Sequence, residues 1–189
     1  MTTGFFENSF KKFCKKNNFE INKKQFEILR SLEKFFFSEK KIINIFSNKK
    51  SKLCYYLYGK VGVGKTVILD HVFQKLNLRK KRSHFNEFMI KFHDYKYKKK
   101  GNDIKKFVKD FKRKYKVLYL DEFQVTNIVD AMILGKLFEV IFDEKIKVIL
   151  SSNTKLEDLY KDGLQREQFI PFIKLIQKNS IQKELKLKD

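Results

Sequence analysis

Residues 53–66 read LCYYLYGKVGVGKT, and this stretch decides the fold of the 189-residue chain. Leu53 to Tyr58 is a short apolar run with the length and composition of a buried strand, and it stops at Gly59. The eight residues from Gly59 fit the pattern G-x-x-x-x-G-K-[ST]. Glycines let a loop curl so that successive backbone N–H groups point at phosphate oxygens, and a following helix adds its positive N-terminal end. The stretch therefore predicts a phosphate-binding loop between a strand and a helix.

The same motif predicts the ligand, which is ATP with Mg²⁺. We expect Lys65 to span the β- and γ-phosphates as a point charge and the Thr66 hydroxyl to ligate the metal. The expected nucleotide-binding residues are Gly59, Lys60, Val61, Gly62, Val63, Gly64, Lys65 and Thr66. A glycine-rich turn without a ligand is the alternative interpretation.

A second strand that ends in acids fits this loop. Val117 to Leu120 is apolar and runs into Asp121 and Glu122. An acidic turn after a strand is ordinary on its own. Beside a phosphate-binding loop it predicts that Asp121 holds the Mg²⁺ shell and that Glu122 orients and polarises the attacking water.

Two further residues are candidates for catalysis. The apolar run Lys147 to Leu150 leads into Asn153. If that strand lies between the other two, the amide reaches the γ-phosphate and the water, as the sensor residue does in AAA+ ATPases. Arg166 is the candidate arginine finger for a neighbouring subunit's nucleotide, which implies a homo-oligomer. The alternatives are an asparagine that only ends a strand and an arginine that only forms an ion pair.

The rest of the chain alternates strand and helix patterns, which predicts an α/β fold with a parallel sheet and flanking helices. Two more strands are expected at 83–88 and 181–187. Helices are expected at 66–76, as an interrupted pair over about 90–115, and at 128–142 and 164–178. Pro171 is expected to kink the last helix or to mark a new start.

We predict two parts in the chain, an N-terminal helical extension at residues 1–50 and the ATPase core at 51–189. In the extension, Asn22 and Gln25 have the spacing of a helix cap. Phe26, Leu29, Leu32 and Phe36 then fall on one helix face, as core-packing residues would.

The chain carries 43 Lys and Arg against 22 Asp and Glu, a net charge of +21. Only five of the 43 are Arg, and Lys, Asn, Ile and Phe rise together, as an AT-rich coding bias would produce. Solvated surface is therefore favoured over an anionic protein or membrane surface, and nucleic acid is favoured least. The basic stretch 96–116 gets the same interpretation, because its apolar residues also form a helical stripe.

The cysteines and the apolar runs indicate where in the cell the protein is expected. Cys14 and Cys54 have no metal-binding spacing and are expected to be buried, reduced thiols. The sequence contains no secretory signal pattern, and its longest apolar runs fall short of the 18 or more residues of a membrane span. A cytoplasmic protein is the expectation, with peripheral contact at a membrane left open.

Beyond these motifs, the sequence resembles the ZapE-type ATPases, which include bacterial cell-division proteins and mitochondrial relatives. The resemblance covers about residues 20–189. The stretches that carry it are RSHFNEFM at 82–89, DEFQVT at 121–126, DAMILG at 130–135, Asn153, EDLYKDGLQR at 157–166 and FIPFI at 169–173.

The resemblance implies an AAA+-like P-loop ATPase that acts on a protein partner. Around its Mg-ATP it implies Lys65, Thr66, Asp121, Glu122 and Asn153, with Arg166 as the finger. For bacterial members it implies an association with the division machinery at the inner membrane face. His84 matches a family position, and we interpret it as a core strand residue.

The chain ends near the expected fifth strand, whereas the relatives continue into a C-terminal helical region. We therefore expect the core without its C-terminal helical lid, and hydrolysis is the activity that depends most on that region. Two other functions stay open, a nucleic-acid-associated AAA+ protein of the helicase-loader type and a truncated module that binds ATP without hydrolysing it.

Overall fold

The computed structural model describes residues 4–37, 51–98 and 104–186. At its centre is a five-stranded sheet in the order β2-β3-β4-β1-β5, and every neighbouring pair is parallel. The strands are β1 (Cys54–Tyr58), β2 (Lys80–His84), β3 (Val117–Asp121), β4 (Lys147–Ser152) and β5 (Ser180–Glu184). Because all strands run the same way, their carboxyl ends meet at one edge of the sheet.

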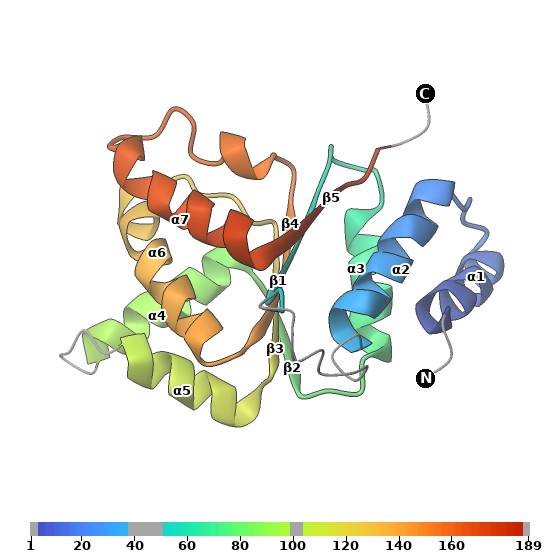
Figure 1. The fold of residues 1–189 in the computed structure, drawn as a ribbon, viewed down its shortest axis with the longest axis horizontal. Coiled ribbons are helices and arrows are strands. Elements are labelled where there is room, and N and C mark those ends of the chain that lie inside the picture. Colours follow the sequence, from blue (N-terminus) through green and yellow to red (C-terminus); the bar gives the residue numbers. More distant parts are fainter. Residues whose placement is uncertain (1–3, 38–50, 99–103, 187–189) are drawn as a thin grey trace, which may run out of the picture.

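Helices cover both faces of the sheet (Figure 1). One side carries α1 (Phe5–Asn17), α2 (Lys23–Phe37) and α3 (Lys65–Lys75). The other side carries α4 (Phe85–Lys98), α5 (Ile104–Lys114), α6 (Ile128–Asp143) and α7 (Arg166–Asn179). A short 3-10 helix, Leu156–Asp158, follows β4. The predicted α/β fold with a parallel sheet is confirmed.

Strand side chains alternate between two cores, because successive residues of a strand point to opposite faces. In β3, Tyr119 packs with α1–α3, whereas Leu118 and Leu120 pack with α4–α7. In β4, Ile149 belongs to the first core and Val148 to the second. Both faces of the sheet are thus buried, which explains why its central strands read as continuous apolar runs.

Helices α1 and α2 complete the core on the α3 side. Asn22 Oδ1 accepts a hydrogen bond from the N–H of Lys24, and Gln25 Oε1 accepts one from the N–H of Asn22, so the predicted cap is confirmed. Leu29 and Leu32 are fully buried against this core. Residues 38–50 lie outside the described residues, and the division into 1–50 and 51–189 stays a prediction.

The predicted strand at 83–88 is wrong in most of its length. The strand is Lys80–His84, and α4 begins at Phe85. Phe85, Phe88, Met89 and Phe92 are all buried, which is the i, i+3, i+4, i+7 spacing of a helix face. Strand β2 was missed because it lies at the edge of the sheet, where polar residues pair as a strand without an apolar run.

The end of the chain differs from expectation in two places. Helix α7 continues through Pro171, so a new start at that residue is wrong. Pro171 lies on the exposed side, where the backbone carbonyl that loses its partner can face solvent. Strand β5 ends at Glu184, earlier than predicted, and residue 187 lies outside the described residues.

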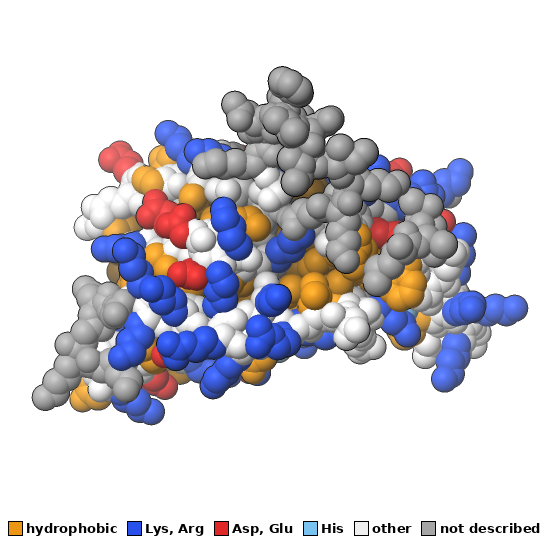
Figure 2. Space-filling view, turned by 60° about the horizontal axis from the view of Figure 1, so that its bottom comes forward, with side chains coloured by type: hydrophobic (Ala, Val, Ile, Leu, Met, Phe, Trp, Pro, Cys, Tyr) orange, Lys and Arg blue, Asp and Glu red, His pale blue; other side chains and the backbone are white. Residues whose placement is uncertain are grey.

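The positive charge lies on the surface, and Figure 2 shows lysine and arginine side chains gathered over one face. In α5, Ile104 and Val108 are buried while Lys105 and Lys109 are exposed, which confirms the predicted core stripe. Cys14 and Cys54 are free and buried, as expected. In the part of the chain that the structure describes, no helix is both long and apolar enough to cross a bilayer.

Candidate active site

The candidate site lies at the carboxyl edge of the sheet, where β1, β3 and β4 end. Strand β4 pairs with β1 on one side and with β3 on the other. This meets the condition on which the sensor role of Asn153 depends, and it brings the segments after the three strands together. It is also the edge at which open α/β sheets bind ligands.

The loop after β1 is shaped by its glycines. A Cβ atom at Gly59 would lie 2.2 Å from the backbone oxygen of Leu185, so only glycine allows the approach of the chain after β5. Gly64 has a φ of 92° and caps α3, with no side chain bonded at the cap. The N–H groups of the first turn of α3 are therefore available to an anion.

Lys65 begins α3, and its side chain folds back over this loop. Its Nζ donates to the carbonyls of Gly59 at 2.7 Å and Lys60 at 2.8 Å, and to Oδ1 of Asn153 at 2.9 Å. Lys65 is 8% exposed, and this burial lowers its pKa, an effect that the nearby charge of Asp121 opposes. Two predicted site residues from distant segments, Lys65 and Asn153, are thus in direct contact.

Asp121 ends β3 and is almost fully buried. Ser151 Oγ donates to its Oδ1, and Arg82 Nη2 donates to its Oδ2 at 2.6 Å. Arg82 also forms an ion pair with Asp70 of α3, with Nε 2.9 Å from Oδ1, although this N–H is not aligned for a hydrogen bond. The carboxylate is held in place from two neighbouring strands.

Sequence reasoning missed Arg82, Asp70 and Ser151 as members of the site. Arg82 carried the one usable signal, because it is among the chain's five arginines and opens the RSHFNEFM stretch. Asp70 and Ser151 have no local pattern that separates them from ordinary helix and strand residues.

Glu122 follows Asp121 in the left-handed conformation, with a φ of 54°, and its side chain is exposed. Its Oε2 lies 3.8 Å from Nδ1 of His84. The interpretation of His84 as a core residue is wrong. It is the last residue of β2, paired in register with Asp121, and its side chain is 46% exposed at the open edge of the sheet.

The residues present fit a magnesium nucleotide. The free N–H groups at the start of α3 and the Lys65 ammonium group supply donors for phosphate oxygens. Thr66 is exposed on the first turn of α3, and Asp121 supplies a carboxylate. Hydroxyl and carboxylate oxygens suit Mg²⁺, which usually takes its remaining ligands from water and phosphate. The part of the chain that the structure describes has no cluster of three or more His, Cys, Asp or Glu side chains suited to a metal.

Arg166 begins α7 beside the 3-10 helix. Its Nη2 donates to the carbonyl of Glu157 at 2.5 Å, and its Nε is buried without a hydrogen-bond partner. This contact lies within one chain, and the role of Arg166 at a neighbour's nucleotide stays a prediction.

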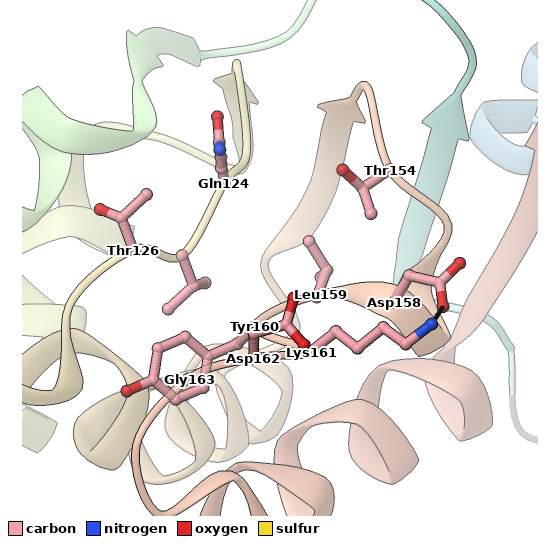
Figure 3. Close-up of a pocket in the computed structure, with 10 residues that line it drawn as sticks. Gln124, Thr126, Thr154, Asp158, Leu159, Tyr160, Lys161, Asp162 and Gly163 are labelled. Atoms are coloured by element: carbon pink, nitrogen blue, oxygen red, sulfur yellow. Dashed lines mark ion pairs between the residues drawn. The ribbon is translucent and has the colours of Figure 1, made fainter.

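A cavity of about 330 Å³ lies beside these segments. Figure 3 shows Gln124 and Thr126, from the chain after β3, on one side of it and Thr154, after β4, on the other. Lys161 and Asp158 form an ion pair at its margin, 3.9 Å apart. A larger groove of about 520 Å³ lies between α4 and the start of α6, around His93.

Residues 11–182 match the protein-family model described as AFG1-like ATPase. Lactation elevated protein 1 homolog B of Danio rerio is 41% identical over 133 residues, covering 63% of this chain and 26% of that protein. Cell division protein ZapE of Escherichia coli K12 is 39% identical over 127 residues, covering 66% of this chain and 34% of that protein. The chain thus spans between about a quarter and a third of the length of these relatives.

Solved structures share the fold at low identity. The crystal structure of DnaI superposes with a TM-score of 0.61 and 20% identity, covering 90% of this chain and 89% of that one. AMPPCP-bound DnaA from Aquifex aeolicus gives a TM-score of 0.64 and 18% identity, covering 91% of this chain and 50% of that one. The fold is therefore that of the P-loop NTPases, as the loop motif predicts.

Proposed function

The chain belongs to the AFG1-like ATPase family, and from this premise we propose that it binds Mg-ATP at the carboxyl edge of its sheet and hydrolyses it. The observation that carries the proposal is the hydrogen bond between Lys65 and Asn153. It joins the phosphate-binding loop to the end of the strand next to Asp121, which supports a single site for phosphate, metal and water.

Each residue has a role that follows from its chemistry. The loop from Gly59 to Thr66 presents N–H groups to the phosphates, and Lys65 exchanges its carbonyl partners for phosphate oxygens. Thr66 and Asp121 hold Mg²⁺, which when bound neutralises charge on the phosphates. Glu122 is exposed and next to Asp121, so it can accept a hydrogen bond from the attacking water.

The partner and the assembly are further parts of the proposal. The relative from E. coli is named a cell division protein, and we propose a protein partner, of the division machinery or an equivalent system, for this chain. We also propose a homo-oligomer, in which Arg166 would act as an arginine finger on a neighbouring subunit's nucleotide. Cytoplasmic location and peripheral contact with a membrane stay predictions.

ATP turnover of the wild type beside two variants tests the proposal. Lys65→Ala should lose nucleotide binding together with turnover. Glu122→Gln should bind nucleotide and turn it over at least about 100-fold more slowly, because only the water-polarising group is lost. The matched controls are Lys75→Ala and Glu139→Gln, which change exposed residues of α3 and α6. Equal turnover in all five proteins would refute an ATPase at this site.

Two other outcomes separate the alternatives. Nucleotide affinity with no turnover, even at high protein concentration, would indicate a module that binds ATP without hydrolysing it. DNA binding that falls steeply with salt and changes with ATP would indicate the helicase-loader type. The likeness to DnaI and DnaA is a likeness of fold at 20% identity or less and does not favour that function.

A further inference from the structure

The Asp70–Arg82–Asp121 group is the part of the site that the proposed roles leave unexplained. Arg82 projects from β2 between the metal-side carboxylate of Asp121 and the helix that carries the phosphate-binding residues. Its guanidinium carbon lies 5.3 Å from the centre of the Tyr119 ring, which supports one face of the planar group. Arg82 is thus fixed by a ring and by two carboxylates at once.

The hydrogen bonds to Asp121 leave part of its accepting capacity unused. Each carboxylate oxygen can accept about two hydrogen bonds. Ser151 takes one position on Oδ1 and Arg82 takes one on Oδ2. The N–H of Glu122 takes the second position on Oδ1, at 3.1 Å. The side chain is thus held in one orientation, while the second accepting position of Oδ2 is not taken by these three donors.

The charges of the group also matter. Asp121 and Arg82 alone would cancel and leave a neutral pair, which attracts a divalent cation weakly. Asp70 lies 2.9 Å from Arg82 and brings the sum for the three side chains to −1. The positive charge of Lys65 also interacts with the charge of Asp121. In the proposed function, however, the Lys65 charge is directed at the phosphates. Asp70 therefore restores the negative charge that Arg82 would otherwise cancel.

We propose that Arg82 is a positioning residue that orients Asp121 for Mg²⁺, with Asp70 as its counter-charge, so that this pair sets the Mg²⁺ requirement of nucleotide binding. The inference rests on the proposed nucleotide site. The planar guanidinium fork of Arg82 is essential to this role, because a lysine ammonium group is a point charge on a flexible stem and cannot face both carboxylates in the same way. An arginine at this position therefore has a reason to persist in a chain whose other basic residues are almost all lysine.

The test measures the affinity of a fluorescent ADP analogue, first in EDTA and then during a Mg²⁺ titration. We expect Arg82→Lys and Asp70→Asn to bind as the wild type does in EDTA. The Mg²⁺ concentration that gives half of the affinity gain should rise about ten-fold in each, as is typical when the partner of a metal ligand is changed. Both side chains are about one-third exposed, so the variants should fold, which thermal melting checks.

A control variant and a double variant test whether a change in the Mg²⁺ requirement comes from the Asp70–Arg82–Asp121 group. Arg79→Lys is the matched control, because Arg79 is exposed and its side chain donates to the carbonyl of Arg113, away from Asp121. The double variant Arg82→Lys/Asp70→Asn should be no worse than the worse single variant, because both changes act through Asp121. An unchanged Mg²⁺ requirement, or an equal loss of binding in EDTA, would overturn the inference. Failure of the wild type itself to bind nucleotide would instead refute the proposed function.

Discussion

Nζ of Lys65 donates a hydrogen bond to Oδ1 of Asn153 across 2.9 Å, and the same ammonium group is bonded to two carbonyls of its own loop. A phosphate that binds this ammonium group must displace at least one of these three acceptors. In the proposed function Asn153 therefore has two opposing effects, since it holds Lys65 before nucleotide binds and would contact the reacting groups afterwards.

Asn153→Ala should separate these effects. We expect ADP to bind at least as tightly as in the wild type, because one bond that competes for Lys65 is gone. Turnover should fall about 10- to 100-fold, because a polar group near the reacting phosphate is lost. Calorimetric affinity and steady-state turnover measure the two quantities. A parallel fall of affinity and turnover would show that Asn153 only supports the structure of the loop.

His84 gives a second prediction, because its Nδ1 lies 3.8 Å from the Glu122 carboxylate. We expect His84→Ala to lower turnover about ten-fold, since an exposed carboxylate without a neighbour samples more orientations, while nucleotide affinity stays unchanged. His93→Ala is the comparison, because His93 pairs with Asp130 at 2.7 Å in the groove beside α4. If His84→Ala weakens nucleotide binding as well, the contact with Glu122 is not its main role.

His71 gives a pH prediction. It lies on α3, where its Nε2 contacts Ser9 Oγ at 2.8 Å and its ring packs on Phe10 of α1. Burial lowers its pKa, and Lys75 adds to the effect. Below the ordinary histidine pKa of about 6.5, the unfolded chain therefore binds more protons than the folded chain, and stability falls as the pH is lowered until the folded-state pKa is passed.

His71→Gln removes this contribution because glutamine does not titrate. Melting temperatures of the wild type and the variant, measured from about pH 7.5 down to about pH 5, should show a steeper loss for the wild type. Two parallel curves would mean that His71 does not couple the α1 contact to pH.

Two of the three glycines of the loop predict a difference in stability. A Cβ atom at Gly59 would meet the Leu185 carbonyl at 2.2 Å, whereas one at Gly62 would meet nothing within 4 Å. We expect Gly59→Ala to lower the free energy of unfolding by about 2 to 4 kcal/mol. Gly62→Ala should cost about 1 kcal/mol, from its positive φ alone. Urea denaturation measures both, and equal costs would contradict the close packing at Gly59.

The central part of the fold could be predicted from sequence because its signals are local. Strands β1, β3 and β4 are apolar runs that end in a glycine loop, two acids and a short polar segment. The position of β4 between β1 and β3 was only a condition for the sensor role of Asn153, and the structure meets it. Strand β2 was not predicted, because Lys80 and Arg82 satisfy their charges through contacts with α3 and Asp121 that no local pattern reveals.

The limits of prediction at the site have the same cause. Lys65, Asp121, Glu122 and Asn153 follow motifs of fixed spacing. The contact between Arg82 and Asp121 joins residues 39 positions apart and depends on the pairing of β2 with β3. The exposure of His84 depends on where β2 ends, and strand ends are poorly marked in sequence when a helix follows at once.

The close approach of Leu185 to Gly59 has a mechanical consequence. The backbone N–H of Leu185 also donates to the Tyr58 carbonyl at 2.8 Å, so the chain that leaves β5 contacts the last residue of β1 and the first residue of the loop. Any displacement of the loop toward β5 must push that chain ahead of it. Movement of the loop in that direction is thus opposed by direct steric contact with the backbone that follows β5.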